Sequence, residues 1–496
     1  MKLNINLNKK NDEKSKSLLL SNILIFISIA VSLYILIDKR RPVQYEYLPL
    51  LPLFFGTFSI FFINNIKKYF NNTTFTLVYF SYSIRCVILP LILCLNGYNL
   101  LLGEYKTIVD YSILYKNMNF SIILSIYELM IVFLVMRVMF FLEKFTSNHI
   151  VIKDKVKLEN VNNMFGKKAK YFISISTFII LLSVLFSPQL LDYFSFFIET
   201  SEIQNYTKRI ELLNLRNQVP PLIYWTFVTF VRILQVFLPI ILIYKIYVKY
   251  EEKNQLLGLI FSIFVITIVF TIMTPEKINS VVLALILLII TSNMYEKYKK
   301  YIFILLILLI SFSILGLFYK SGLYKDQPDV NSLFSSTVNA YFSGIINISA
   351  AVSMVKPINL SIVVSDFINS IPFMSYFFKN YETTPQVYNE FIKGSYTQVT
   401  KIIPMIGQGN FYFGFIFSPI FSLVSILLAF FYEKKVKQTK NFIEKYIYLY
   451  ACISFAISPI MYNLNIAISN FFFILIYTYL ISSNDKYPQN MKEKRV

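Results

Sequence analysis

Charged residues are scarce in this chain. Of its 496 residues, 15% are Asp, Glu, Lys or Arg and 56% are hydrophobic, and the mean hydropathy is +0.58. A soluble protein of this length carries roughly 25% charged residues. Uncharged runs such as Phe261–Met273 and Val281–Ile290 are apolar throughout rather than alternating, which favours helices over strands. The composition therefore excludes a soluble globular domain and predicts an all-α, polytopic transmembrane helix bundle.

Cysteine and histidine are also rare. The three cysteines, Cys86, Cys94 and Cys452, lie in apolar segments and form neither a disulfide framework nor a metal-binding spacing. The sole histidine, His149, lies in a loop that we predict to be cytoplasmic. We therefore expect no metal and no cofactor, and we exclude external chemistry that relies on a histidine base.

Basic residues outnumber acidic residues by 47 to 27, which gives a net charge of +20. In a soluble protein this excess would indicate nucleic acid, but in a membrane protein basic residues concentrate in cytoplasmic loops. We therefore expect no nucleic-acid partner. The amino terminus and every second loop hold roughly twice the Lys and Arg of the remaining loops, which predicts both termini in the cytoplasm. The run Lys39–Arg41 is the exception, because it falls outside in this topology.

Long apolar segments predict about twelve membrane spans. They cover residues 18–37, 47–64, 73–95, 121–142, 170–187, 222–248, 255–273, 278–293, 300–318, 406–431, 443–460 and 465–482. Residues 18–37 are too long for a signal-peptide core without a cleavage site, so we expect a retained first span.

Two external loops divide the chain into three parts. Residues 1–318 would hold nine spans and an external loop at 188–221, residues 319–405 a large external loop, and residues 406–496 three spans and a cytoplasmic tail. The large loop contains two apolar stretches, Val338–Val355 and Leu360–Phe378, which we expect to form interfacial or re-entrant helices. If both crossed the membrane, the orientation would be unchanged. Asp366 interrupts the second stretch, so it is either a site residue or the polar edge of an interfacial helix.

Ionisable residues inside predicted spans cost about 2.5–3.5 kcal/mol each and therefore mark sites or pathways. Arg85, Glu128 and Arg232 lie in the third, fourth and sixth predicted spans. Glu128 either pairs with Arg85 across helices or belongs to a site. Arg232 lies about ten residues from the external end of its span, too deep to reach water easily, so we expect it to face the protein interior.

A second set of basic residues faces outside in the predicted topology. They include Lys208, Arg209, Arg216 and Lys277. Thr274-Pro275 is a helix-start pattern, and it would place Lys277 beside the positive end of a helix dipole. Each of these residues alone is explained as a solvated surface charge. Together with Arg85 and Arg232, they predict a binding site for an anionic ligand at the outer leaflet, such as a lipid pyrophosphate.

The segment Ile403–Gly414 reads IPMIGQGNFYFG. It resembles the signature of Wzy-type polymerases, which often read Pro, a few residues, Gly-Glu, an aromatic stretch and Gly at this place. The matching positions are Pro404, Gly407, Gln408, Gly409 and Gly414. The resemblance also covers the architecture, namely many helical spans, two large external loops and a basic residue that opens a middle span. The chain departs from the family pattern in carrying Gln408 where an acid is frequent, and Lys277 rather than Arg.

The resemblance implies an enzyme of the bacterial plasma (inner) membrane, a glycosyltransferase that joins undecaprenyl-pyrophosphate-linked oligosaccharide repeat units into O-antigen or capsular polysaccharide. An acceptor sugar hydroxyl would attack the anomeric carbon of the growing chain, and lipid pyrophosphate would leave. Cationic side chains would stabilise the leaving group, and Asp366 and Glu390 are the candidates for a general base. Membrane lipid, a flippase and a chain-length regulator would be its partners.

Three other membrane functions fit part of the sequence. A flippase for lipid-linked oligosaccharides would share the spans and buried arginines, but it needs no structured external loop of roughly eighty residues. An O-antigen ligase performs related chemistry, and the lack of an external histidine argues against it. A lipid-phosphosugar glycosyltransferase would carry acids in its first external loop, where this chain has only Asp38 and Glu46 at the margins. The flippase is the alternative that the sequence leaves open.

Overall fold

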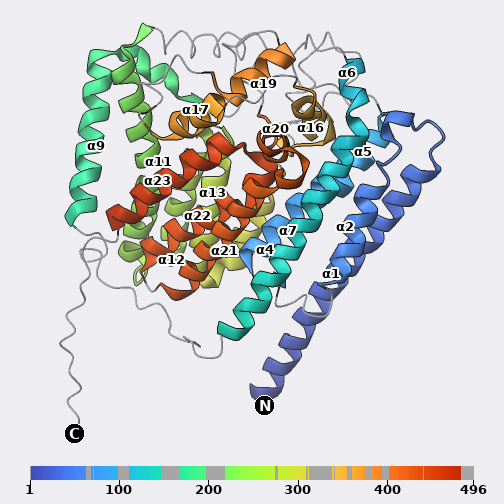
Figure 1. The fold of residues 1–496 in the computed structure, drawn as a ribbon. Helices are drawn as coiled ribbons and strands as arrows, with labels where there is room; N and C mark the ends of the chain where they lie inside the picture. Colours follow the sequence, from blue (N-terminus) through green and yellow to red (C-terminus); the bar gives the residue numbers. More distant parts are fainter. Residues whose placement is uncertain are drawn as a thin grey trace.

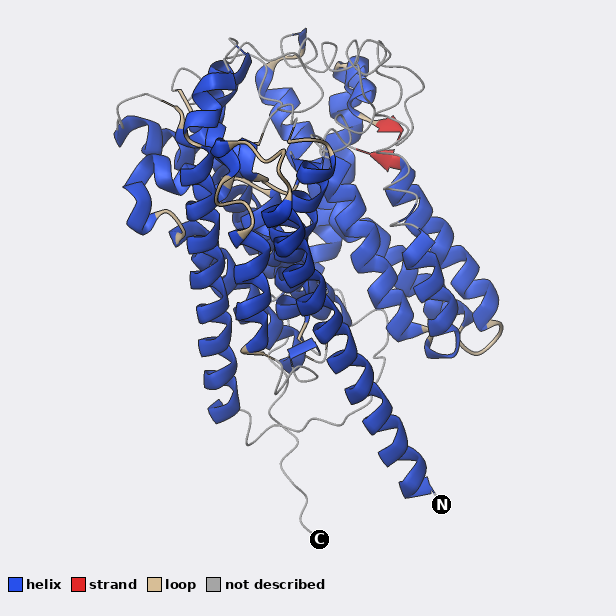
Figure 2. Ribbon diagram, turned by 90° about the vertical axis from the view of Figure 1, so that its right-hand side faces the viewer, coloured by secondary structure: helices blue, strands red, loops and turns tan. Residues whose placement is uncertain are grey.

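The computed structural model describes most of the chain as helix (Figures 1 and 2). The described residues are 2–62, 69–70, 72–98, 111–146, 167–196, 218–273, 277–308, 311, 338–339, 341–354, 360–372, 374, 382–393, 402–439 and 441–481. Within these ranges the strands are β1 (Ser195–Phe196) and β2 (Ile272–Met273), which pair antiparallel.

The helices follow the apolar segments of the sequence. They are α1 (Lys2–Ile37), α2 (Leu50–Ile60), α4 (Thr73–Ser83), the π-helix η3 (Ile84–Ile88), α5 (Leu89–Leu95), α6 (Tyr111–Lys116), α7 (Met118–Thr146), α9 (Lys167–Phe186), α11 (Pro221–Tyr250), α12 (Gln255–Thr271), α13 (Lys277–Met294), α16 (Ile345–Val352), α17 (Leu360–Ser370), α19 (Thr384–Lys393), α20 (Met405–Phe417), α21 (Ile420–Gln438), α22 (Phe442–Met461) and α23 (Leu464–Ile481). Short 3-10 helices are η1 (Val43–Tyr45), η5 (Pro188–Tyr193) and η6 (Glu296–Tyr298).

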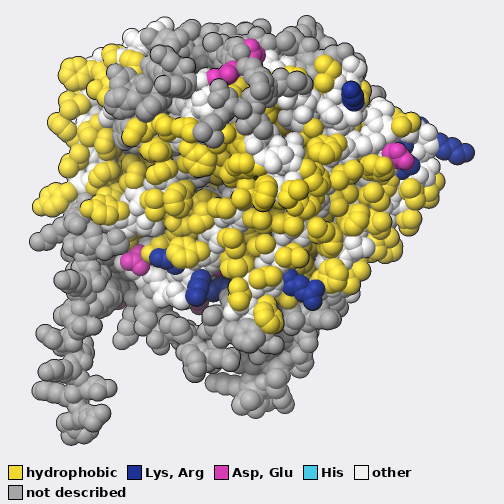
Figure 3. All heavy atoms as spheres, viewed as in Figure 1, with side chains coloured by type: hydrophobic (Ala, Val, Ile, Leu, Met, Phe, Trp, Pro, Cys, Tyr) yellow, Lys and Arg dark blue, Asp and Glu magenta, His cyan; other side chains and the backbone are white. Residues whose placement is uncertain are grey.

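Several of these helices have the length and composition of membrane spans. Among the described residues, 4 helices qualify, or up to 6 if each of two bent pairs is one span. The straight ones are Thr73–Leu95, Met118–Leu142, Pro221–Tyr250 and Leu464–Ile481. On the face drawn in Figure 3, hydrophobic side chains form a broad band, and charged side chains lie at its upper and lower edges. A band of exposed apolar side chains suits hydrocarbon rather than water, so the chain is a helical membrane protein.

The centre of the bundle is α22, whose side chains are buried along nearly its whole length. Helices α4, α13, α21 and α23 pack around it. Outer helices instead expose large apolar side chains, such as Leu185 of α9 (76% exposed) and Phe264 of α12 (62% exposed). The helices of the large predicted loop, α16, α17 and α19, lie at the end of the bundle opposite the start of α1 (Figure 1).

The loop helices α16 and α17 contain 8 and 11 residues. At a rise of about 1.5 Å per residue, they reach about 12 and 17 Å, well short of the ~30 Å hydrocarbon core. Neither crosses a membrane alone. Helix α16 is nonetheless buried, and it packs against α7 and α20.

The structure differs from the sequence-based expectation at residues 406–431, which we predicted to be one span. Helices α20 and α21 are bent by 103° at this place. Gly414 has φ +71, a left-handed conformation that glycine adopts without steric cost. Pro419 stands at the start of α21 and has no backbone N–H to continue a helix. By length and composition, the bent pair Met405–Gln438 is either one broken span or a re-entrant loop, and we call it the re-entrant hairpin after its bend.

The contact between α16 and the re-entrant hairpin requires a glycine. A Cβ built on Gly407 would lie 2.5 Å from the Cβ of Ala351. We therefore predict that Gly407→Ala lowers the melting temperature of the purified protein by several degrees, because overpacking typically costs about 1–3 kcal/mol.

The second-site change Ala351→Gly removes the opposing Cβ and supplies the matched control. Combined with Gly407→Ala, it should recover part of the loss, although glycine in a helix itself costs about 1 kcal/mol. A thermal unfolding series in detergent measures all three variants. Equal melting temperatures for Gly407→Ala and the native chain would show that the two helices do not meet at this point.

Candidate functional site

The re-entrant hairpin is built by the residues of the predicted motif. Pro404 is the N-cap of α20. A Cβ on Gly409 would lie 2.1 Å from the backbone oxygen of Ser418, so only glycine lets the chain fold back this closely. Gly414 supplies the left-handed turn at the bend. Gly409 and Gly414 are therefore explained by the backbone geometry of the hairpin, which fixes where Gln408 points.

Gln408 connects the hairpin to the start of α23. Its side chain is fully buried. Its Nε2 donates to the Tyr412 hydroxyl over 2.8 Å and to Oδ1 of Asn465 over 3.0 Å, and its Oε1 accepts from the backbone N–H of Leu464 over 2.9 Å. An amide can donate and accept at once, whereas an ionised glutamate only accepts. The departure from the family pattern at Gln408 is thus matched by the hydrogen bonds around it.

Asp366 lies at the centre of the same network. Its Oδ1 accepts from the backbone N–H of Thr384 over 3.0 Å and from Nδ2 of Asn465 over 2.9 Å, and its Oδ2 accepts from the Tyr412 hydroxyl. The Thr384 hydroxyl lies 2.8 Å from the Tyr412 hydroxyl. Helices α17, α19, α20 and α23 therefore meet at one carboxylate. We call Asp366, Thr384, Gln408, Tyr412 and Asn465 the Asp366 cluster.

The electrostatics of Asp366 reflect its position. The side chain is fully buried, and its partner Thr384 begins α19, whose positive dipole end favours a carboxylate. Burial raises the pKa of the Asp366 carboxyl above its usual range, although hydrogen bonds from Thr384, Tyr412 and Asn465 lower it. Glu390 lies half-buried further along α19, and the described hydrogen bonds of Asp366 do not include it.

Arg232 is the cationic part of the site. Its Nη2 donates to Oδ1 of Asn470 over 2.6 Å and its Nη1 to the Ser469 hydroxyl over 3.4 Å. The guanidinium lies 4.3 Å from the centroid of the Phe473 ring, within the range of a cation–π contact. The side chain is thus turned toward α23 and the protein interior, as we predicted from its depth in the span.

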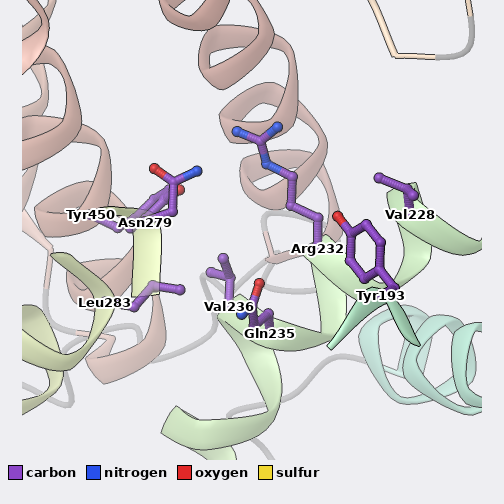
Figure 4. A pocket seen from close by; sticks show the side chains of 8 residues that line it. All are labelled: Tyr193, Val228, Arg232, Gln235, Val236, Asn279, Leu283 and Tyr450. Carbon is purple, nitrogen blue, oxygen red and sulfur yellow. The ribbon is translucent and has the colours of Figure 1, made fainter. Parts of the chain in front are cut away.

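Arg232 also lines a pocket between α11, α13 and α22. Figure 4 shows the lining side chains, with Arg232 and Gln235 on α11 and Asn279 and Leu283 on α13. Asn279 accepts a 3.0 Å hydrogen bond from the Tyr462 hydroxyl. The full lining consists of Tyr193, Val228, Arg232, Gln235, Val236, Asn279, Leu283 and Tyr450. The lining mixes polar and apolar side chains, and Arg232 is its charged member.

Helix α23 holds the acidic and the cationic parts together. Asn465 contacts Asp366, and Ser469 and Asn470 contact Arg232. Asn465 precedes Ser469 and Asn470 by four and five residues, which is about 6 to 7.5 Å along the axis at 1.5 Å per residue. The site therefore places a buried carboxylate and a partly buried guanidinium against one helix, which suits a reaction that moves a proton and stabilises negative charge.

The remaining predicted site residues do not join this arrangement. Arg85 pairs with Glu128 at 2.6 Å, the alternative that the sequence left open for Glu128. Lys277 is the first described residue of α13, but its side chain and the predicted helix start at Thr274-Pro275 lie outside the described part. Lys208, Arg209 and Arg216 also lie outside the described residues. Within the described ranges, no three His, Cys, Asp or Glu side chains gather as a metal site would require.

Sequence reasoning missed Thr384, Tyr412, Asn465 and Asn470. Tyr412 belongs to the quoted motif, but its aromatic character gave no reason to expect a hydrogen bond to Asp366. Asn465 and Asn470 stand in an otherwise apolar helix, and polar amides in such a helix are a usable signal. No family model, no curated protein and no solved structure matches the chain significantly.

The raised pKa of Asp366 predicts a pH dependence of stability. A raised native pKa means that the folded state holds the proton more tightly than the unfolded state. The stabilisation is therefore full below the ordinary value of 3.8 and is lost as pH rises through the native pKa. We predict that the melting temperature of the native chain, measured relative to that of Asp366→Asn, falls as pH rises from about 4 to 7.

Asp38 supplies a control of opposite sign. Hydrogen bonds from the Arg40 side chain and backbone hold the pKa of Asp38 below its ordinary value. Its contribution is therefore present above the ordinary pKa of 3.8 and is lost as pH falls below it, so the native chain, measured relative to Asp38→Asn, should change little between pH 4 and 7 and lose stability as pH falls below about 4. Parallel slopes for the two variants would contradict the assignment of Asp366.

Proposed function

We propose that this protein is a polymerase that joins polyprenyl-pyrophosphate-linked oligosaccharide repeat units by glycosyl transfer at the outer face of the bacterial plasma membrane. The observation that carries the proposal is that Asp366 and Arg232 contact the same helix, α23, through Asn465 and Asn470. The motif residue Gln408 is hydrogen-bonded to Asn465 as well. The resemblance of Ile403–Gly414 to Wzy-type polymerases supports the substrate class.

The proposed topology has about twelve spans, with both termini in the cytoplasm and residues 319–405 outside. The arrangement of the bundle supports it, because α16, α17 and α19 lie at the end opposite the start of α1 (Figure 1). The Asp366 cluster includes residues of α17 and α19, so this topology puts it near the outer surface.

In the proposed reaction, an acceptor sugar hydroxyl attacks the anomeric carbon of the growing chain. The new bond joins the acceptor oxygen to that carbon, the bond to the pyrophosphate oxygen breaks, and lipid pyrophosphate leaves with the electron pair. Arg232 stabilises the developing negative charge with a planar guanidinium, and Lys208, Arg209, Arg216 and Lys277 add positive charge.

Asp366 takes the proton of the acceptor hydroxyl. Its burial raises its pKa, which makes it a better base than an exposed aspartate. Because Tyr412 donates to Asp366 in the structure, the acceptor hydroxyl replaces the Tyr412 hydroxyl on Oδ2 when it binds. Glu390 is the second candidate for this role.

A gene deletion separates the polymerase from a flippase. Loss of a polymerase leaves single repeat units outside the cell, on the lipid carrier or its acceptor, while loss of a flippase traps lipid-linked units in the cytoplasm. Accumulation in the cytoplasm alone would overturn the proposal in favour of the flippase.

A variant series tests the role of Arg232. Lysine keeps the charge but loses the fork that binds two phosphate oxygens, so we predict that Arg232→Lys accumulates normally and makes about tenfold less long-chain polymer, the effect of about 1.4 kcal/mol.

Arg137→Lys is the matched control, because Arg137 also lies over an aromatic ring, 5.3 Å from the centroid of Phe61, but is exposed. It should leave chain length unchanged. Polymer length is read on gels against the amount of protein in the membrane. Native chain lengths from Arg232→Lys at normal expression would place the pyrophosphate site elsewhere.

A further inference from the structure

A buried ion pair lies in the bundle, and neither of its residues belongs to the Asp366 cluster. Nη1 of Arg85 lies 2.6 Å from Oε2 of Glu128, and both side chains are almost fully buried. The other Glu128 oxygen accepts a hydrogen bond from the Ser422 hydroxyl. Because Ser422 is on α21, the pair connects η3 and α7 to the re-entrant hairpin.

The backbone around Arg85 is unusual. Residues Ile84–Ile88 form a π-helix between α4 and α5. Such single π-turns inside α-helices occur frequently at functional sites. The Nε and Nη2 atoms of Arg85 and the hydroxyl of Tyr82 are buried with no hydrogen-bond partner among the described residues. Each unsatisfied buried donor destabilises the fold.

This pair is therefore poorly explained as a source of stability. Replacing a buried ion pair by apolar side chains of similar volume is often neutral or stabilising, whereas removing one partner alone is strongly destabilising. An ion pair differs from an apolar contact in being directional, and its direction bears on the neighbouring helices, α7 and the re-entrant hairpin.

Residues 124–128 of α7 lie against the re-entrant hairpin over about one turn. The Tyr127 hydroxyl donates to the backbone oxygen of Ile416 over 3.0 Å, and the Tyr127 ring stacks on Phe415 at a centroid distance of 4.9 Å. Leu124 packs in one buried cluster with Ile406 of α20. Glu128 is the next residue after Tyr127, so fixing Glu128 fixes the surface on which the bend rests.

We propose that the Arg85–Glu128 pair is a positioning device for the re-entrant hairpin. Its directional contacts hold α7 in one position against η3. The hydrogen bond between Glu128 and Ser422 then holds α21 in a fixed position relative to α7. The bend of the hairpin then fixes Gln408 and Tyr412 in the Asp366 cluster. The inference rests on the proposed function only for what these two residues do; the positioning itself is a property of the fold.

The double variant Arg85→Met/Glu128→Leu separates positioning from stability. We expect each single variant to melt earlier than the native protein, and the double variant to melt at the native temperature or above it. We expect the hairpin of the double variant to be displaced. Spin labels at Ile60→Cys on α2 (50% exposed) and Phe417→Cys at the bend (60% exposed) report the displacement as a distance. The native cysteines are buried, so labelling is confined to the introduced ones.

The expected result is a broadened distribution, or a mean distance shifted by about 2 Å or more, the scale of helix shifts that alter packed interfaces. Ser422→Ala, which removes only the link to α21, should broaden the same distribution without lowering the melting temperature by more than a few degrees. The matched control is Arg40→Met/Asp38→Leu, at a 3.0 Å ion pair whose arginine is 61% exposed. It should leave the distance unchanged.

Native distance distributions in the double variant and in Ser422→Ala would overturn the proposal. So would a double variant that melts as early as the single variants or fails to accumulate, because the pair would then be a stability element. The measurement involves no substrate. If the hairpin moves while polymer length stays native, the positioning stands and the proposed function of Gln408 and Tyr412 fails.

Discussion

The buried carboxylate of Asp366 is the contact on which the arrangement of this end of the bundle depends. An isolated charge in a protein interior is very costly, and it persists only where hydrogen bonds satisfy it. Here the donors come from three separate segments, through the Thr384 N–H, the Tyr412 hydroxyl and the Asn465 amide. Because each donor is brought by a different helix, α19, α20 and α23 can satisfy the charge only in one relative position. The same carboxylate is also the strongest candidate for a proton acceptor.

The re-entrant hairpin is what makes this convergence possible. A straight helix over residues 406–431 would run on in one direction, whereas the structure turns by 103° between α20, which carries Gln408 and Tyr412, and α21. Close packing at Gly409 and the left-handed turn at Gly414 produce the bend. Helix α23 then adds the cationic half, since Asn470 contacts Arg232 a little over one turn after Asn465. The acid and the cation are thus positioned by rigid helices rather than by loops.

Much of the helix content was predictable from the sequence, because apolar length determines where a membrane helix can lie. The expected spans 73–95, 222–248 and 465–482 agree closely with Thr73–Leu95, Pro221–Tyr250 and Leu464–Ile481. The bend at 406–431 was not predicted, since hydropathy is insensitive to a backbone that reverses within an apolar run. Asp366 was recognised because it interrupts such a run. The partners of Asp366 were not recognised, because they come from segments far apart in the sequence. For the same reason, the sequence could propose the pairing of Arg85 with Glu128 but could not decide it.

The central claim is that Arg232 and its surroundings bind the pyrophosphate of a lipid-linked substrate. The most direct test is the binding of polyprenyl pyrophosphate to the purified protein, compared with the uncharged polyprenol, by the shift in melting temperature with ligand concentration. The account predicts that the pyrophosphate stabilises the native protein more than the polyprenol does, and that Arg232→Lys weakens its binding about tenfold while binding of the polyprenol is unchanged. Equal stabilisation by the two lipids, or unaltered binding of the pyrophosphate to Arg232→Lys, would contradict it.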